Sequence, residues 1–427
     1  MNEPTRIATG RPKIADIVLR DYQAVGCDLI RQSFGRREIP LVVAPTGAGK
    51  GTLAAYMLAE ATKKGNPSLI IAPRRELIYD LHNRLADAGV ESGMIIDGEP
   101  RLRDRAIQVA TIQTLYARPD DLPEASFVVW DEAHHCVARS YQQVKESYPR
   151  AKHVGLTATP RRSDKTALGN VFTHLIVIAT PKGLMQRGFL VPCRILSPDN
   201  ALDGNLADDP VSVYADHTPG QRAIVFAKSQ DHAQALADEF GAAGFSSAAV
   251  DAKTPREVRR TLIQLFREGT IQVLCNVDVL TEGFDAPETE VVILAKKCAT
   301  ETPFLQRCGR GLRPAPGKSF CTLIDLPGSW HVHGRPSDER DFSLDGNPIR
   351  LKDRDETKCP ACKNLVDAWM IAEGGPGCPF PKWSGEICGF VRKKASVPVV
   401  ARPEIVGAAI IDYATEQLSL PFMEGAA

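Results

Sequence analysis

A glycine-rich loop, APTGAGKGT at residues 44–52, constrains this chain more than any other segment. The loop follows the apolar run IPLVVAP, which predicts a β-strand, and precedes LAAYMLAEATKK, which predicts a helix. Gly47 and Gly49 allow backbone N–H groups to turn inward around phosphate oxygens, and the helix start adds the positive end of its dipole. Lys50 supplies a charge for the β- and γ-phosphates. The segment therefore predicts a site for ATP.

One position of this loop departs from the usual pattern. The hydroxyl residue that normally adjoins the lysine and holds Mg²⁺ is replaced by Gly51, and Thr52 follows one place later. A similar GKGT string occurs in some nucleotide kinases, so we expect Thr52 to bind Mg²⁺ directly or through water. The alternative is a glycine-rich loop that only joins strand to helix. The strand, the lysine and the helix in the correct order disfavour it.

A pair of carboxylates ends a later apolar strand, in FVVWDEAHH at residues 127–135. Open parallel sheets hold their ligands at the carboxyl ends of their strands. We expect Asp131 to hold Mg²⁺ and Glu132 to accept a proton from the water that attacks the γ-phosphate, with His134 in the nucleotide-binding set. A solvated acidic strand end is the alternative. The string LTATPRR, which begins at residue 156, adds two short hydroxyls that could relay a nucleotide change.

Short apolar runs alternate with helical patterns between residues 39 and 178, and a second such series runs from 223 to 326. This alternation predicts an α/β fold with two tandem parallel-sheet lobes. The predicted division is lobe one, an inter-lobe linker, lobe two, a small cysteine-containing module and a tail, at residues 1–180, 181–215, 216–330, 331–395 and 396–427 respectively.

Composition excludes some classes of protein and leaves others open. The 427 residues contain 52 Lys plus Arg and 52 Asp plus Glu, so net charge indicates no polyanionic partner. No apolar run approaches the length of a membrane span and the N-terminus has no signal-peptide core, so we expect a cytoplasmic protein without membrane contact. Seven of the eleven cysteines are scattered without paired spacing, which predicts reduced thiols.

The second series contains the basic segment FLQRCGRGLRP, at residues 304–314. This segment contains Gln306, Arg307, Arg310 and Arg313 and is predicted to be helical, with Arg310 and Arg313 on one face. Guanidinium groups in such an array can neutralise the charge that develops on a transferred phosphoryl group. A basic surface helix is the alternative reading of this segment alone.

Taken in order, the Lys50 loop, the DEAH string and LTATPRR resemble motifs I, II and III of the superfamily 2 helicases in their DEAH-box form. LRDYQ (19–23) resembles the upstream element whose glutamine, here Gln23, recognises adenine. APRRELIYDL (72–81) resembles the motif that touches the nucleic-acid backbone, and ATIQTL (110–115) resembles the next one.

The resemblance continues through CNVDVLTEGFDAPETEVVIL (275–294) and the arginine segment, which are similar to motifs V and VI. It implies two RecA-like lobes and places Gly283 and Asp285 among the nucleotide-binding residues. It assigns catalysis to Glu132 together with Gln306, Arg310 and Arg313. It further implies that ATP hydrolysis drives movement along a DNA or RNA backbone with little sequence preference.

Within superfamily 2, GFLVPCR (188–194) and LTEGFDAP (280–287) look closest to the XPB-like helicases and the restriction-enzyme motor subunits of bacteria and phages. This favours DNA over RNA as the track. Three alternatives remain: an ATPase that clamps nucleic acid without unwinding it, a nucleotide kinase built on GAGKGT, and a zinc-binding module with a degenerate motor. A kinase would need an acceptor site and lid, whereas this chain has a second helicase-like lobe.

Four cysteines cluster after the second lobe: Cys359, Cys362, Cys378 and Cys388. The first two form a CPAC knuckle, and the spacing resembles a zinc ribbon with a long final gap. We expect one structural Zn²⁺ held by four thiolates, because this segment has few aliphatic residues for a core of its own. Nearby aromatic and basic side chains could also contact nucleic acid.

The C-terminal tail contains an apolar string, QLSLPF, from Gln417 to Phe422. It resembles the short peptides by which bacterial replication and repair proteins bind the sliding clamp. Leu418, Leu420 and Phe422 could bury apolar area in a groove while Gln417 hydrogen-bonds at its edge. The alternatives are a tail that folds back onto a lobe and a chance similarity.

Overall fold

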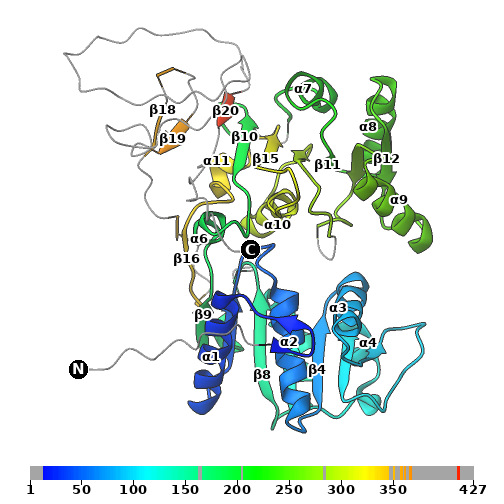
Figure 1. The fold of residues 1–427 in the computed structure, drawn as a ribbon, viewed down its shortest axis with the longest axis vertical. Coiled ribbons are helices and arrows are strands. Elements are labelled where there is room, and N and C mark those ends of the chain that lie inside the picture. The colour runs from blue at the N-terminus through cyan, green and yellow to red at the C-terminus, as the bar shows by residue number, and fades with distance from the viewer. Residues whose placement is uncertain are drawn as a thin grey trace, which may run out of the picture. The chain divides into compact units, whose positions relative to one another are not determined.

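The computed structural model describes residues 13–161, 166–202, 205–281, 285–345, 350–351, 356–358, 360–361, 365–367 and 411–413. The chain forms two compact units, the first ending at Thr180 and also taking in residues 341–350, and the second beginning at Pro181. Each unit is built on a seven-stranded sheet. Figure 1 shows both sheets with many of their elements labelled. The predicted α/β class with two parallel-sheet lobes is confirmed.

The first unit contains a parallel sheet in the order β5-β6-β4-β7-β8-β3-β9. Its strands are β3 (Pro40–Val43), β4 (Ser68–Ala72), β5 (Gly93–Ile95), β6 (Ile107–Thr111), β7 (Phe127–Trp130), β8 (Lys152–Thr157) and β9 (His174–Val177). A strand pair, β1 (Lys13–Ile14) and β2 (Ile17–Val18), lies outside the sheet. The side chains of β3, β4, β6 and β7 are buried along the whole strand, as expected for a sheet covered on both faces.

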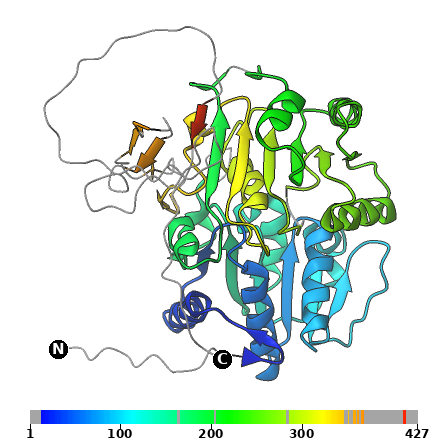
Figure 2. The same cartoon turned by 45° about the horizontal axis from the view of Figure 1, so that its top comes forward.

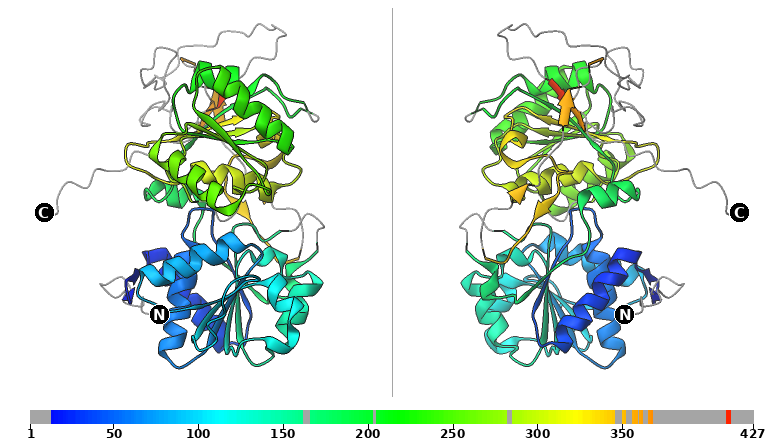
Figure 3. Two further views of the ribbon diagram at one scale, coloured as in Figure 1. Left: turned by 90° about the vertical axis from the view of Figure 1, so that its right-hand side faces the viewer. Right: turned by 90° about the vertical axis from the view of Figure 1, so that its left-hand side faces the viewer.

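Helices cover both faces of this sheet, and Figure 3 shows the strands between them. One core contains residues of α1 (Asp21–Gly35), α2 (Lys50–Lys63) and α3 (Arg75–Asp87). The other contains residues of α4 (Ile112–Ala117) and α5 (Arg139–Glu146), with the single-turn helices η2 (Ala133–His135) and η3 (Leu168–Asn170). A third such turn is η1 (Pro119–Asp121). Helix α2 buries seven consecutive residues, so it is packed on all sides rather than on one face.

The second unit contains a sheet in the order β12-β13-β11-β14-β15-β10-β20, parallel except for β20. Its strands are β10 (Cys193–Ser197), β11 (Ala223–Phe226), β12 (Ser247–Val250), β13 (Val273–Asn276), β14 (Val291–Leu294), β15 (Cys321–Asp325) and β20 (Ile411–Tyr413). Its helices are α6 (Pro181–Gln186), α7 (Pro210–His217), α8 (Gln230–Ala242), α9 (Arg256–Glu268), α10 (Glu301–Gly311) and α11 (Trp330–His333). Helices α8 and α9 contact β12 at one edge of this sheet, as the views in Figures 1 and 2 show.

Two expectations from the sequence differ from this fold. The segment 181–215 is predicted as a linker, but it contains α6, β10 and most of α7, and β10 lies inside the second sheet beside β15. Turn-forming residues lie on both sides of CRILS, so the sequence does not predict this short buried strand. The predicted tail contributes β20, which pairs with β10 through its backbone.

The small strand pairs are β16 (Arg340–Asp341) with β17 (Arg350–Leu351), and β18 (Glu356–Lys358) with β19 (Leu365–Asp367). Among the described residues, no helix is long and apolar enough to span a bilayer.

Candidate nucleotide site

The first unit brings its three predicted motifs together through sheet order. Strand β8 lies between β3 and β7, so the carboxyl ends of these strands are neighbours. The Lys50 loop follows β3, Asp131 and Glu132 follow β7, and Thr157 ends β8. Because carboxyl ends of parallel strands share one edge, the sequence-predicted groups of this unit meet at one site.

The loop has the backbone that its glycines predict. Gly47 and Gly49 have φ angles of 86° and 76°, in the left-handed region that glycine adopts without strain. Lys50 is the first residue of α2, and its Nζ donates to the carbonyl oxygen of Ala44 at 3.1 Å. The first turn of α2 contains no acidic side chain. The loop, the lysine and the helix dipole together favour an anion here.

Helix α1 braces this loop through two side chains. Tyr22 Oη donates to the Ala48 carbonyl at 2.7 Å, and Gln23 Nε2 donates to the carbonyls of Ala48 and Gly49 at 3.2 and 3.0 Å. The Gln23 side-chain oxygen accepts from the Arg20 backbone N–H at 2.8 Å. Gln23 is 1% exposed, so the structure shows it holding the loop, and its predicted contact with adenine stays a prediction.

Glu132 occupies an unusual position at the end of β7. It has φ 47° and ψ 50°, a left-handed conformation that is costly for a residue with a side chain. Its carboxylate is buried, and Oε2 accepts no hydrogen bond from the described residues. His134 Nδ1 lies 3.4 Å from that oxygen, beyond hydrogen-bond geometry. The site therefore presents a carboxylate oxygen that can accept a proton.

His134 connects this carboxylate to the end of β8. Its Nδ1 lies 3.1 Å from Thr157 Oγ1, which donates to the Thr159 carbonyl at 2.9 Å. Because the hydroxyl proton is used in that second bond, Nδ1 must be the donor in the first. Gly155 permits this packing, since a Cβ there would lie 2.8 Å from the Cβ of Ala133 on the same turn as His134.

Asp131 and Thr52 supply the oxygen ligands that Mg²⁺ prefers, so the residue types suit the metal. Thr52 Oγ1 also accepts a hydrogen bond from Arg84 Nη1 at 3.3 Å. Arg84 lies on α3, outside every motif that the sequence indicated. Arg84 and Thr52 are far apart in the sequence, so the sequence alone does not predict this contact.

The arginine segment of the second unit is only partly helical. Helix α10 ends at Gly311, so Arg313 lies beyond it and the predicted shared face with Arg310 is wrong. The sequence CGRGL does not predict that the helix ends at Gly311. Arg310 is buried and its Nε donates to the Gln306 carbonyl at 3.3 Å. Arg313 pairs with the carboxylate of Asp285.

Sequence reasoning missed an ion-pair cluster around Asp278. Its carboxylate contacts Lys296 Nζ at 2.6 Å and Arg307 Nη2 at 2.8 Å. Burial opposes ionisation of Asp278, but the two cations outweigh it and hold the pKa of that carboxyl below its usual value. Arg307 also lies over the Phe226 ring at 5.5 Å. Arg307 is thus committed to contacts inside the second unit.

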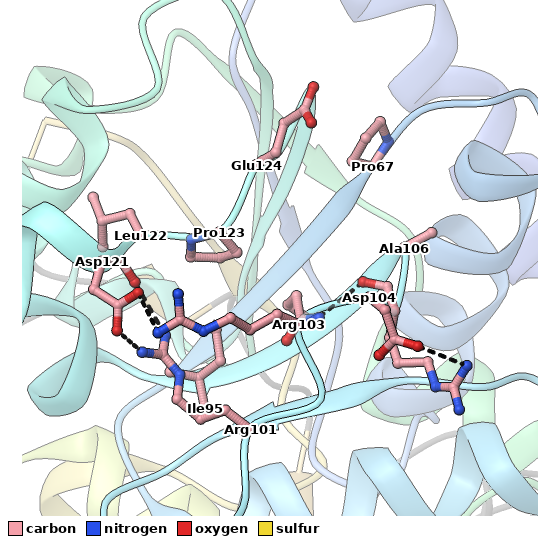
Figure 4. A pocket seen from close by; sticks show the side chains of 12 residues that line it. Pro67, Ile95, Arg101, Arg103, Asp104, Ala106, Asp121, Leu122, Pro123 and Glu124 are labelled. Carbon is pink, nitrogen blue, oxygen red and sulfur yellow. Dashed lines mark hydrogen bonds and ion pairs between the residues drawn. The ribbon is translucent and has the colours of Figure 1, made fainter.

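A cavity of about 400 Å³ in the first unit lies beside Pro67 and Ala106, at the amino ends of β4 and β6. Figure 4 shows Arg101 and Arg103 reaching the same carboxylate, that of Asp121. Its arginine charges are thus paired with carboxylates of the chain. The nucleotide motifs lie at the opposite ends of these strands, so this cavity is not the predicted ATP site.

Several predicted site residues lie outside the described residues. They are Gly283, the four clustered cysteines Cys359, Cys362, Cys378 and Cys388, and the peptide 417–422. Within the part of the chain that the structure describes, no group of three or more His, Cys, Asp or Glu side chains could hold a metal. The scattered cysteines are free and buried, as predicted; they are Cys27, Cys136, Cys193, Cys275, Cys298, Cys308 and Cys321.

Two family descriptions match this chain. Residues 16–162 match "Type III restriction enzyme, res subunit", and residues 207–315 match "Helicase conserved C-terminal domain". The first match contains the Lys50 loop and the Glu132 turn, and the second contains α10.

Named proteins are similar over most of their lengths. The 51.5 kDa protein of Lactococcus phage (isolate 7-9) is 29% identical over 355 residues, covering 78% of this chain and 76% of that protein. The DNA 3'-5' translocase XPB2 of Sulfurisphaera tokodaii is 24% identical over 382 residues, covering 74% of this chain and 84% of that protein.

Among solved structures, a fragment of a putative HsdR subunit of a type I restriction enzyme from Vibrio vulnificus YJ016 has a similar fold. Its TM-score is 0.59 at 22% identity, over 77% of this chain and 67% of that one.

Proposed function

We propose that this chain, an ATP-hydrolysing helicase or translocase of superfamily 2, acts on DNA. The observation that supports ATP hydrolysis is the buried Glu132 oxygen at the strand edge that also holds the Lys50 loop. A carboxylate placed beside a phosphate loop is suited to activating water for attack on a γ-phosphate. DNA is favoured because the similar protein of Sulfurisphaera tokodaii is named a DNA 3'-5' translocase.

In the proposed mechanism, Lys50 and the backbone N–H groups of the loop bind the β- and γ-phosphates. Asp131, with Thr52, would hold Mg²⁺, which supplies positive charge to the phosphates when it is bound. Glu132 takes the proton from the attacking water. In the second unit, Arg310 and Arg313, with Gln306, offset the charge that develops on the transferred phosphoryl group.

The DEAH assignment gives His134 a coupling role. Its hydrogen bond to Thr157 joins the turn that contains Glu132 to the end of β8. A change at Glu132 during hydrolysis can therefore alter the position of the Thr157–Thr159 turn through one hydrogen bond. This role makes His134 a positioning residue rather than a catalytic one.

The direct test compares stimulation of ATP hydrolysis by single-stranded DNA, duplex DNA, single-stranded RNA and duplex RNA. We expect DNA to raise the turnover number several-fold and RNA to leave it near the basal rate. Stimulation by RNA alone would refute the DNA assignment while leaving the ATPase intact. An ATPase indifferent to all four would refute the motor function.

We also propose that the cysteine cluster binds one structural Zn²⁺. The support is the CPAC spacing of Cys359 and Cys362, in the segment that connects the paired strands β18 and β19. We expect about one zinc per chain in protein purified without chelator, and loss of the metal from the Cys359→Ser variant with retained basal ATPase. Zinc that survives substitution of both cysteines would contradict the proposal.

For the tail, we propose that Gln417–Phe422 binds a bacterial sliding clamp, which would place the enzyme at replication or repair sites in the cytoplasm. The support is the alternation of Leu418, Leu420 and Phe422 after a glutamine. A binding measurement with the clamp of the host decides it. Binding should be lost in Gln417→Ala and Leu420→Ala, and no detectable binding by the unaltered protein would reject the proposal.

A further inference from the structure

The start of helix α2 has more positive charge than the motifs explain. Lys50 is its first residue, and Arg84 reaches Thr52, its third residue, from α3. The first turn contains no acidic side chain, and among the described residues no carboxylate pairs with Arg84. Arg84 is exposed, so its side chain is accessible to a ligand.

This helix start is suited to an anion. The start of α2 carries the positive end of its helix dipole, which favours a nearby anion. Lys50 adds a positive charge to the same turn. Arg84 itself lies in the last turn of α3, where the dipole of its own helix favours a cation. An anion at the start of α2 would therefore interact favourably with both side chains.

The unusual Gly51 is explained by the same arginine. A Cβ at position 51 would lie 3.3 Å from Arg84 Nε and 3.9 Å from its Cδ and Cζ. The Cβ of a serine or threonine there would require the Arg84 side chain to move by a few tenths of an ångström. The hydroxyl usually found after the lysine is thus missing at the point where an arginine approaches.

Arg84 also affects the predicted metal ligand. Its Nη1 donates to Thr52 Oγ1, the oxygen expected to bind Mg²⁺. A guanidinium group and a divalent cation repel each other on one hydroxyl. Arg84 therefore makes Thr52 a poorer metal ligand and brings a fixed positive charge close to the place where the metal would sit.

We infer that Arg84 binds a phosphate oxygen of the nucleotide. The absence of a side chain at Gly51 leaves the space that the Arg84 guanidinium group needs to reach the site. Arg84 then supplies part of the charge that a hydroxyl-bound Mg²⁺ supplies in the usual loop. The inference rests on the proposed role of the Lys50 loop as the ATP site. It makes nucleotide binding less dependent on Mg²⁺ than the usual loop would.

The experiment measures the affinity of the full chain for a fluorescent ADP analogue, with Mg²⁺ and with EDTA. We expect Arg84→Gln to weaken binding about tenfold in EDTA, the usual loss for a charge-assisted hydrogen bond, and less in Mg²⁺. Arg84→Lys should lose part of this affinity, because it keeps the charge without the fork. Lys63→Gln, at the far end of α2, is the matched control and should bind normally.

A double-mutant cycle tests the link to Gly51. Gly51→Ser should weaken binding in EDTA by displacing the arginine, and it should have no further effect in the Arg84→Gln background. Additive effects of the two substitutions would refute the link between them. Unfolding midpoints equal to that of the unaltered protein verify that the variants are folded.

The outcomes of these experiments distinguish failure of this inference from failure of the proposed ATP site. If Lys50→Ala abolishes binding while Arg84→Gln binds as the unaltered protein does in EDTA, the ATP site stands and the inference fails. If Lys50→Ala also binds normally, the proposed site itself is wrong. Loss of DNA affinity without loss of nucleotide affinity in Arg84→Gln would assign the arginine to the nucleic acid and overturn the inference.

Discussion

Glu132 combines two features that are each unfavourable for stability. Its left-handed backbone costs roughly 1–3 kcal/mol for a residue with a side chain, and its Oε2 is buried without a hydrogen bond from the described residues. The neighbouring fold holds it there, since η2 packs closely over Gly155. Local cost of this kind concentrates at functional sites. Its position at the strand edge beside the phosphate loop makes it the strongest candidate for the base.

The Glu132→Gln substitution tests this assignment. It keeps the shape of the side chain but removes the group that accepts the proton, so DNA-stimulated turnover should fall at least about 100-fold. Affinity for ATP should stay within a few fold, since the phosphate contacts are unaltered. The control is Glu146→Gln at the exposed end of α5. Turnover close to that of the control would eliminate Glu132 as the base.

Asp325 predicts a pH effect in the second unit. Burial raises the pKa of Asp325 from 3.8 to about 6, although backbone N–H groups of Trp330 and Ser329 oppose the shift. The folded state thus holds this proton more tightly than the unfolded chain. The contribution of Asp325 to stability is greatest below about pH 4 and is lost as the pH rises towards 6.

Replacing Asp325 with Asn should remove this pH dependence. The variant should be the more stable protein above about pH 6, by at most roughly 3 kcal/mol. The measurement is the free energy of unfolding of both proteins at several values between about pH 4 and pH 8. Parallel profiles over that range would show that Asp325 has no such pKa.

The phosphate-binding role of the Lys50 loop can be predicted from the sequence because phosphate binding requires glycines and a lysine at fixed spacing. The contact of Arg84 with this loop cannot be predicted in this way. It comes 32 residues after Thr52, and only the packing of α3 beside α2 brings the two together. Asp278 was missed for the same reason, since its partners Lys296 and Arg307 are distant in sequence.

Element boundaries were predicted less well than element types. For α9, Thr254 in the string TPRE predicts the helix cap and Gly269 predicts the helix end. The Thr254 hydroxyl instead donates to the Asp251 carboxylate, and Pro255 precedes the helix. The end at Gly269 is correct, with φ 83°. A helix end that needs a left-handed residue is marked by glycine, whereas a hydroxyl has several possible partners.

Helix α10 contains Arg310, which we expect to be needed for stimulated ATP turnover. Arg310→Ala should lower stimulated turnover about 1,000-fold, the range found when a phosphoryl-transfer arginine is removed. Arg313→Ala should act in the same direction, although Arg313 lies beyond the helix. Because Arg310 is buried, Arg310→Lys provides a second variant that keeps charge and stem. Normal turnover in Arg310→Lys and Arg310→Ala alike would exclude the residue from catalysis.

At the scale of the whole molecule, the repeated strand and helix pattern was enough to predict two parallel-sheet lobes. The alternation of strands and helices depends on short local stretches of the chain, so it can be recognised in the sequence. The contribution of β10 and β20 to the second sheet is not local. These strands pair across more than 200 residues, and short apolar runs give no sign of such partners.

The central claim is that ATP hydrolysis by this chain drives movement along DNA. The most direct measurement follows release of a fluorescent third strand from a DNA triplex, beside displacement of an annealed strand from a partial duplex. We predict ATP-dependent displacement in at least one assay, none with a non-hydrolysable ATP analogue, and none by Glu132→Gln. DNA-stimulated ATP hydrolysis with no displacement in either assay would contradict the claim and identify an ATPase that holds DNA without moving.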